Sequence, residues 1–245
     1  MNKSVIDLLK AHRSIRKFTD RPIDEALLQR LVSAGQSAAT SSHLQACSVI
    51  RVRHQTAREQ LVDVTGGQQY VMSAPEFLVF CADLHRNAWC CESRGQKMAE
   101  GLTEHFILAT VDVALFAQNV AVAAESEGLG ICYIGALRND PVRVSELLNL
   151  PDKVYPVFGL CLGYPDQDPD IKPRLPLDAV LMDDNYQPVD EEQMHQYDQL
   201  TRAYYRRRTG GKLDRSWCEE MAKTLSKESR PHMKAFLASK GFELN

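Results

Sequence analysis

The stretch from Phe106 to Ala124 constrains the fold most, because its 19 residues (FILATVDVALFAQNVAVAA) carry a single formal charge. A run of this length could cross a bilayer. Asp112, Gln118 and Asn119 lie inside it, however, and no basic or aromatic clusters flank it as membrane anchors would. A helix that is apolar almost all round is typical of a large core or a subunit interface. We therefore expect a soluble protein with a buried helix over about 102–127.

The rest of the chain predicts many helices and few strands. Helical spacing and helix-end signals predict helices over about 3–11, 24–36, 56–64, 141–149, 190–207, 214–227 and 231–240. Apolar or alternating runs predict strands over 47–53, 76–82, 131–134 and 155–162. A doubly wound parallel sheet needs more strands, so we expect an α+β fold with a small sheet around the central hydrophobic helix.

Two segments lack any periodicity. Residues 84–101 are polar and are expected to be irregular, and residues 163–189 are rich in Pro and Asp, which predicts an extended surface excursion. The expected organisation is a single domain over 1–245, in which 163–245 forms this excursion and a C-terminal helical arm. Arms of this kind often exchange between protomers, which favours a homodimer.

Charge is unevenly distributed along the sequence. The net charge is −3, whereas residues 201–245 carry 11 Lys and Arg against 5 Asp and Glu. This pattern excludes a general nucleic-acid surface and favours local anion sites, with ordinary solvated helix faces as the alternative. The seven cysteines are scattered without a CxxC pair, so we expect no disulfide framework, no zinc or iron–sulfur site, and a reducing cytoplasm. The N-terminus lacks the apolar run of a signal peptide.

The familiar catalytic motifs are absent. The sequence Gly128-Leu129-Gly130 follows a helix and lacks the third glycine of a dinucleotide fingerprint, and no phosphate loop, GxSxG, HExxH or EF-hand pattern occurs. The histidines show no metal-ligand spacing, so no metal is expected. What remains are four candidate anion-binding patches, at 12–17, at 40–42, at 172–174 and in the basic cluster from Arg206 to Arg230.

Several longer motifs resemble the nitroreductase / flavin reductase family, and within it the NADPH-dependent group A branch. They are HRSIRKF (12–18), SSHLQ (41–45), TGGQ (65–68), AAESEGLGICYIGALRN (123–139), LPDKVYPVFGLCLGYPDQDPDIKPRLP (150–176) and SKESRP (226–231). The resemblance implies a nitroreductase-like α+β fold with a mainly antiparallel sheet, and an intertwined homodimer with FMN at the interface. It implies an enzyme that uses NADPH and FMN to reduce nitroaromatics or quinones in a ping-pong cycle. The missing catalytic dyad fits this activity, because the cofactor carries the chemistry.

The resemblance also implies roles for individual residues. Contacts to the FMN phosphate and ribitol fall on His12, Arg13, Ser14, Lys172 and Arg174. Arg16 and Gln68 approach the pyrimidine side of the ring, where a cation stabilises the negative charge of the reduced flavin. Residues that line the ring, with backbone N–H groups near N5, are Tyr133, Ile134, Gly135 and Ala136. Thr40 and Ser42 lie under the flavin from the partner subunit.

Nicotinamide and acceptor contacts fall in other segments. Arg208 corresponds to the arginine that recognises the NADPH phosphate, and further candidates for this ligand are Lys227, Ser229 and Arg230. His43 stands where relatives often have an apolar residue, and it is expected to touch the acceptor. Ala136 replaces a second glycine usual in relatives, and residues 85–100 are longer than usual.

Three functions follow from these observations. The first is an NADPH-dependent, oxygen-insensitive nitroreductase. The second is a flavin reductase that supplies free reduced FMN to another enzyme. The third is a flavin-binding module without turnover, against which the presence of Arg208 and the SKESRP segment speaks.

Overall fold

The apolar run forms the central helix of the fold, as the sequence predicts. In the computed structural model, which describes residues 4–242, helix α6 spans Thr103–Ser126. Its residues Leu108, Val113 and Val120 are buried, whereas Ile107 and Val111 are about half exposed on the opposite face. α6 is the one helix among the described residues that is long and apolar enough to cross a membrane, which is weak evidence because a core helix passes the same test.

Four strands form one sheet in which all neighbours are antiparallel, in the order β1-β2-β4-β3. They are β1 (Cys47–Arg51), β2 (Glu76–Asp83), β3 (Gly130–Ile134) and β4 (Val154–Gly163). The central strand β2 is buried at every residue. This burial on both faces explains why its sequence is a continuous apolar run rather than an alternating one.

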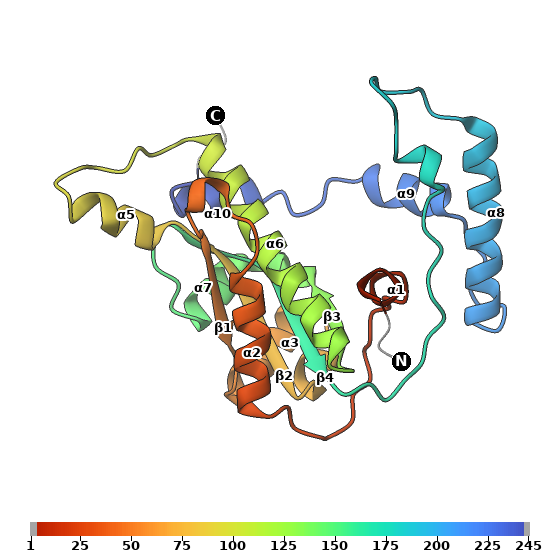
Figure 1. Cartoon of the computed structure of the whole chain (residues 1–245), viewed down its shortest axis with the longest axis horizontal. Helices are drawn as coiled ribbons and strands as arrows, with labels where there is room; N and C mark the ends of the chain where they lie inside the picture. Colours follow the sequence, from red (N-terminus) through yellow and green to blue (C-terminus); the bar gives the residue numbers. More distant parts are fainter. Residues whose placement is uncertain (1–3, 243–245) are drawn as a thin grey trace. The chain divides into compact units, whose positions relative to one another are not determined.

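Helices cover both faces of the sheet, which separates two hydrophobic cores (Figure 1). On one face, Leu78 and Phe80 of β2 belong to a core with α2, α6 and α10. On the other face, Phe77 and Val79 belong to a core with α3, α4 and α7. The bounds of these helices and of α1 are Val5–Lys10 (α1), Glu25–Gln36 (α2), Gln55–Val64 (α3), Tyr70–Ser73 (α4), Pro141–Leu147 (α7) and Met233–Ser239 (α10).

The described chain divides into two compact units. The first holds the sheet and comprises the residues up to Asp168 and from Arg230 on, and the second comprises Pro169–Ser229. The second unit contains a short 3-10 turn (Leu177–Ala179) and helices α8 (Glu191–Arg208) and α9 (Trp217–Leu225). Tyr197 of α8 packs edge to face on Trp217 of α9, with ring centroids 5.8 Å apart.

One prediction of irregular structure is wrong, because helix α5 forms at His85–Glu92. The helix buries only Ala88, so no apolar periodicity announces it in the sequence. Asp83 Oδ1 accepts from the His85 N–H at its start, and Arg86 and Asn87 donate to backbone carbonyls of residues 44–47. Tertiary hydrogen bonds therefore hold α5 where local sequence signals are weak.

Candidate functional site

The N-terminal anion-binding patch lies beside strand β3. Ser14 forms a parallel bridge with Ile131, and the Ile15 N–H donates to the Ile131 carbonyl at 2.8 Å. The Ile15 side chain is buried against Gly130, where any Cβ would come within 2.7 Å of the Cβ of Ile15. The missing side chain at Gly130 thus allows the segment 12–16 to lie directly against the strand that leads to Tyr133.

His12 is held by a carboxylate that the sequence argument did not single out. Its Nδ1 lies 2.6 Å from Oε1 of Glu125, near the end of α6. Because a carboxylate accepts, the proton of this bond is on Nδ1. Glu125 lies within the AAESEG motif, three residues before the glycine that ends the helix, which is the one sequence signal that could have identified it.

Two other cations of the patch have identifiable partners. Arg13 Nη1 forms an ion pair with Asp168 Oδ1 at 2.7 Å. The guanidinium of Arg16 lies 5.9 Å from the ring centroid of Tyr70, two residues after Gln68. Burial raises the pKa of Tyr70, with a smaller opposing effect from Arg16. The structure therefore brings Arg16 to the segment that contains Gln68, as the resemblance implies.

The end of β3 combines buried aromatic surface with a tight turn. Burial raises the pKa of Tyr133 well above its ordinary value, and its ring packs on Phe158 with centroids 5.1 Å apart. Ile134 is only 1% exposed as a whole residue and belongs to the core that also holds Phe77 and Val79. Gly135 and the half-buried Ala136 follow in a 3-10 turn.

Arg138 is a further cation in this region that the sequence argument missed. Its Nη1 donates to the Val157 carbonyl at 2.5 Å, and a Cβ on Gly135 would lie 3.2 Å from its Nη2. Burial lowers the pKa of Arg138, and the charge of Arg230 adds to this effect. Arg230 in turn donates to the side chain of Asn139 at 3.0 Å. Two guanidiniums close together favour an anion here.

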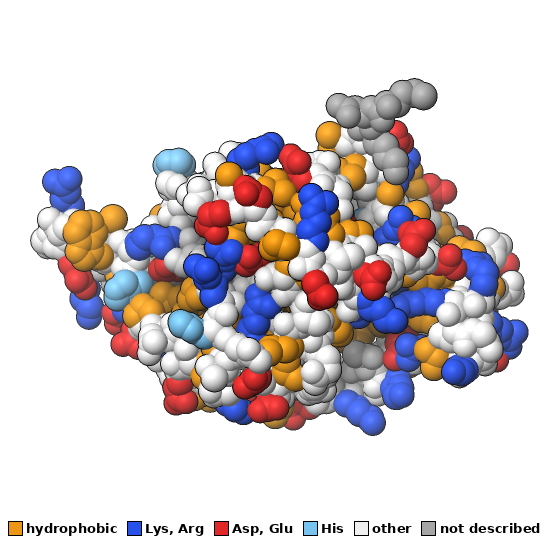
Figure 2. Space-filling view, turned by 90° about the horizontal axis from the view of Figure 1, so that it is seen from below, with side chains coloured by type: hydrophobic (Ala, Val, Ile, Leu, Met, Phe, Trp, Pro, Cys, Tyr) orange, Lys and Arg blue, Asp and Glu red, His pale blue; other side chains and the backbone are white. Residues whose placement is uncertain are grey.

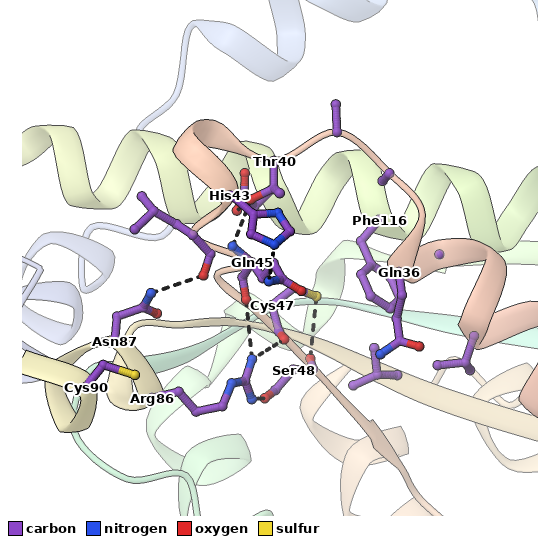
Figure 3. A pocket seen from close by; sticks show the side chains of 17 residues that line it. Gln36, Thr40, His43, Gln45, Cys47, Ser48, Arg86, Asn87, Cys90 and Phe116 are labelled. Atoms are coloured by element: carbon purple, nitrogen blue, oxygen red, sulfur yellow. Dashed lines mark hydrogen bonds between the residues drawn. The ribbon is translucent and has the colours of Figure 1, made fainter. Parts of the chain in front are cut away.

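A cavity of about 600 Å³ adjoins residues 40–46, the loop between α2 and β1 (Figure 3). Thr40 and His43 from this loop line it, together with Arg86 and Asn87 of α5 and residues of α2 and α6. Ser42 is exposed and is not part of the lining. Cys90 also lines the cavity, so the segment that the sequence marks as unusually long contributes to its wall.

The second unit contains the remaining predicted residues. Lys172 and Arg174 are exposed; the Lys172 ammonium lies 5.5 Å from the ring centroid of Tyr205, and Arg174 lies near Tyr197. Neither forms an ion pair with a described residue. Lys227 and Ser229 are exposed at the end of this unit.

Three consecutive arginines at the end of α8 differ in their partners. Arg206 is paired with Asp214 at 2.5 Å and Arg207 with Asp170 at 3.1 Å. Arg208 instead donates to the Tyr204 hydroxyl at 3.3 Å and has no carboxylate partner within residues 4–242. Of the three, Arg208 keeps the most charge available for an anionic ligand.

Acidic and basic side chains alternate on the face drawn in Figure 2, without one continuous basic field. This distribution agrees with the arginine–carboxylate pairs of the second unit.

Comparison with known proteins gives consistent matches over the whole chain. Residues 9–164 match the family model "Nitroreductase family", and residues 172–245 match "Nitroreductase family, C-terminal domain". The chain is 44% identical over 237 residues to the oxygen-insensitive NADPH nitroreductase of Salmonella typhimurium, covering 97% of each protein. It is 43% identical over 238 residues to the NADPH-flavin oxidoreductase of Vibrio harveyi, covering 97% of this chain and 98% of the relative.

Solved structures agree with these matches. The Vibrio harveyi NADPH:FMN oxidoreductase complexed with NAD+ superposes with a TM-score of 0.91 at 42% identity, covering 99% of this chain and 100% of that one. Nitroreductase A from Vibrio parahaemolyticus superposes with the same TM-score at 42% identity, covering 99% of each chain. Motifs, fold and comparisons therefore lead to one conclusion: the chain belongs to the nitroreductase family.

Proposed function

We propose that this chain is an NADPH-dependent FMN oxidoreductase that reduces nitroaromatics and quinones by two electrons. The observation that supports this most is the convergence, within the first unit, of the segment 12–16, the neighbourhood of Gln68 and Tyr70, and the end of β3 at 133–136. These segments are far apart in sequence and carry the residues that the family resemblance assigns to FMN. The names of the relatives point to the same activity.

The chemistry of the converging donors fits FMN. Within the first unit, His12, Arg13 and Ser14 supply nitrogen and hydroxyl donors for a phosphate, and the family resemblance assigns Lys172 and Arg174 of the second unit to the same phosphate. Arg16 provides positive charge near Gln68, and the turn at Gly135 offers backbone N–H groups. When bound, FMN supplies the two-electron chemistry between NADPH and the acceptor. The residues of the chain bind, orient and electrostatically stabilise it.

We assign recognition of the NADPH phosphate to Arg208. A guanidinium that already faces a carboxylate must give up that pair before it can bind a phosphate, whereas Arg208 has only a tyrosine hydroxyl to release. Lys227, Ser229 and Arg230 are assigned to the same nicotinamide or to the acceptor, and His43 is assigned to the acceptor.

The decisive experiment measures the visible absorbance of the purified protein. It should be yellow, and its FMN absorbance should bleach on anaerobic addition of NADPH and return when nitrofurazone or menadione is added. A colourless protein that binds no added FMN would refute the proposal. Steady-state comparison of a nitroaromatic, a quinone and free FMN as acceptors then separates a nitroreductase from a flavin reductase, and turnover with none of the three would leave only a flavin-binding module.

We also propose a homodimer in the cytoplasm. Ile107, Val111 and Leu115 form an apolar stripe along α6, and each of these residues is 43–48% exposed. Residues spaced by four lie on one helix face, so these three side chains form one continuous apolar stripe, as interface helices do. Light scattering should give a mass near twice 27.6 kDa. Val111→Lys should shift the protein towards the monomer, and a wild-type monomer would refute this part of the proposal.

A further inference from the structure

Asp112 is a buried carboxylate in the middle of the most apolar helix of the protein. Only 3% of the residue is exposed, and no cation lies against it in the described structure. Burying an unpaired carboxylate is costly unless hydrogen bonds satisfy it, so its retention at this position calls for an explanation. The nitroreductase activity proposed above does not use it.

All the hydrogen bonds that Asp112 accepts come from one loop, residues 40–46. Its Oδ1 accepts from the Ser41 N–H at 3.0 Å, and its Oδ2 accepts from the Thr40 hydroxyl at 2.5 Å and from the Ala46 N–H at 3.0 Å. The Thr40 hydroxyl in turn accepts from the Gln45 N–H at 2.8 Å. One carboxylate thus joins both ends of the loop to α6.

Side chains of helix α5 hold the same loop by donating hydrogen bonds to the carbonyl groups of the loop. Arg86 Nη2 donates to the carbonyls of Gln45 and Cys47, the second at 2.6 Å, and Asn87 donates to the Leu44 carbonyl at 3.0 Å (Figure 3). The loop therefore has polar partners on two sides. The Asp112 carboxylate accepts from its N–H groups, and the side chains of Arg86 and Asn87 donate to its carbonyl groups. This arrangement satisfies backbone groups that no regular structure pairs.

The loop needs this support because its backbone is strained. Ser42, His43 and Gln45 have φ angles of 47°, 60° and 53°, in the left-handed region that is unfavourable for residues other than glycine. Three such residues within four positions persist only when surrounding contacts determine the conformation. This backbone conformation places the side chain of His43 in the wall of the cavity.

We propose that Asp112 is a positioning residue that fixes the 40–46 loop as the wall of the acceptor pocket and so determines which acceptors fit. The proposal rests on the proposed function in taking the cavity beside Thr40 and His43 as part of that pocket. Asp112 borders the cavity with only 3% of its surface exposed, and it acts on the loop through Thr40, Ser41 and Ala46. Loosening the loop should widen the pocket and favour bulky acceptors over small ones.

The first test is amide hydrogen exchange in Asp112→Asn, measured residue by residue on the FMN-loaded protein. An asparagine side chain has one oxygen, so either Ser41 or Ala46 must face its NH₂ group and lose an acceptor. We expect exchange at one of these two amides to accelerate about tenfold or more. Thr110→Val is the matched control, because it removes a hydrogen bond to Tyr155 from the same helix without touching the loop.

The second test is the ratio of kcat/KM for a bulky acceptor, menadione, to that for a small one, p-benzoquinone. A loss of folded protein lowers both values equally, so a merely structural role cannot move this ratio. We expect Asp112→Asn to raise the ratio about fivefold or more through the KM of the small acceptor, and Thr110→Val to leave it unchanged.

Each outcome decides between the alternatives. Unchanged exchange at Ser41 and Ala46 would overturn the proposal, as would accelerated exchange with an unchanged acceptor ratio. A wild-type protein that binds no FMN would refute the proposed function instead, and exchange would still report whether Asp112 holds the loop. If Asp112→Asn does not fold, Thr40→Val replaces it with Thr40→Ser as its control, and the amide to follow is that of Gln45.

Discussion

Gly130→Ala tests whether the contact between segment 12–16 and strand β3 builds the FMN site. The added Cβ would lie 2.6 Å from Cγ1, 2.7 Å from Cβ and 3.0 Å from Cγ2 of Ile15. Because the Cβ of Ile15 is one of these atoms, rotating its side chain cannot relieve the clash. The backbone of the segment must retreat by about 1 Å, a displacement that is enough to disrupt precise placement of functional groups.

The expected magnitude follows from the cost of overpacking. Inserting a methyl group into such a contact costs about 1–3 kcal/mol. If the segment bears this cost when FMN binds, the dissociation constant should rise about 5- to 150-fold. The assay is titration of the apoprotein into FMN, followed by quenching of flavin fluorescence, together with thermal unfolding of the apoprotein.

A control separates affinity from stability. Val52 is 3% exposed and follows β1, which lies at the opposite edge of the sheet from β3. Val52→Ala should lower the melting temperature while leaving the FMN dissociation constant within about twofold of wild type. A folded Gly130→Ala protein with wild-type affinity for FMN would refute the reasoning, since the segment would then not need its place against β3.

Three further predictions follow from the partners of individual charged or buried groups. Arg208→Ala should raise the KM for NADPH about 10- to 150-fold with little effect on the KM for NADH, whereas Arg207→Ala, whose guanidinium already faces a carboxylate, should change neither; equal effects on both nicotinamides would contradict the assignment. Glu125→Gln should weaken FMN binding about three- to tenfold, because a neutral amide holds the His12 ring less firmly than a carboxylate does, and an unchanged affinity in fluorescence titration would contradict a contact between His12 and the phosphate. Burial raises the pKa of Cys47 to about 12, so above pH 9 the thiol ionises in the unfolded chain but not in the folded one. The free energy of unfolding should therefore fall as pH rises above 9, by up to about 1.4 kcal/mol per pH unit from this thiol, and urea melts of Cys47→Ala should show a correspondingly shallower slope.

The resemblance and the local patterns together predicted which segments contribute to the site. The motifs at 12–18 and 123–139 predicted that His12 to Arg16 and Tyr133 to Ala136 serve one cofactor, and the structure pairs Ser14 of the first motif with Ile131 of the second. Glu125 and Arg138 lie inside the second motif and were missed, because a charged residue within a matching motif gives no sign of what it faces. The roles assigned to Lys172, Arg174 and Arg208 remain predictions for the experiments above.

Hydrophobic patterning by itself determined the central helix, the four strands and most of the other helices. Most of those elements bury their own apolar residues, and burial leaves a period in the sequence. The helix α5 and the conformation of residues 40–46 were decided only in three dimensions. Their stability comes from polar side chains such as Asp112 and Arg86 that pair with backbone groups far away in sequence, and such pairs leave no periodic signal. For the same reason the sequence does not distinguish Arg208 from Arg206 and Arg207. In the described structure, however, carboxylates pair only with Arg206 and Arg207 of these three.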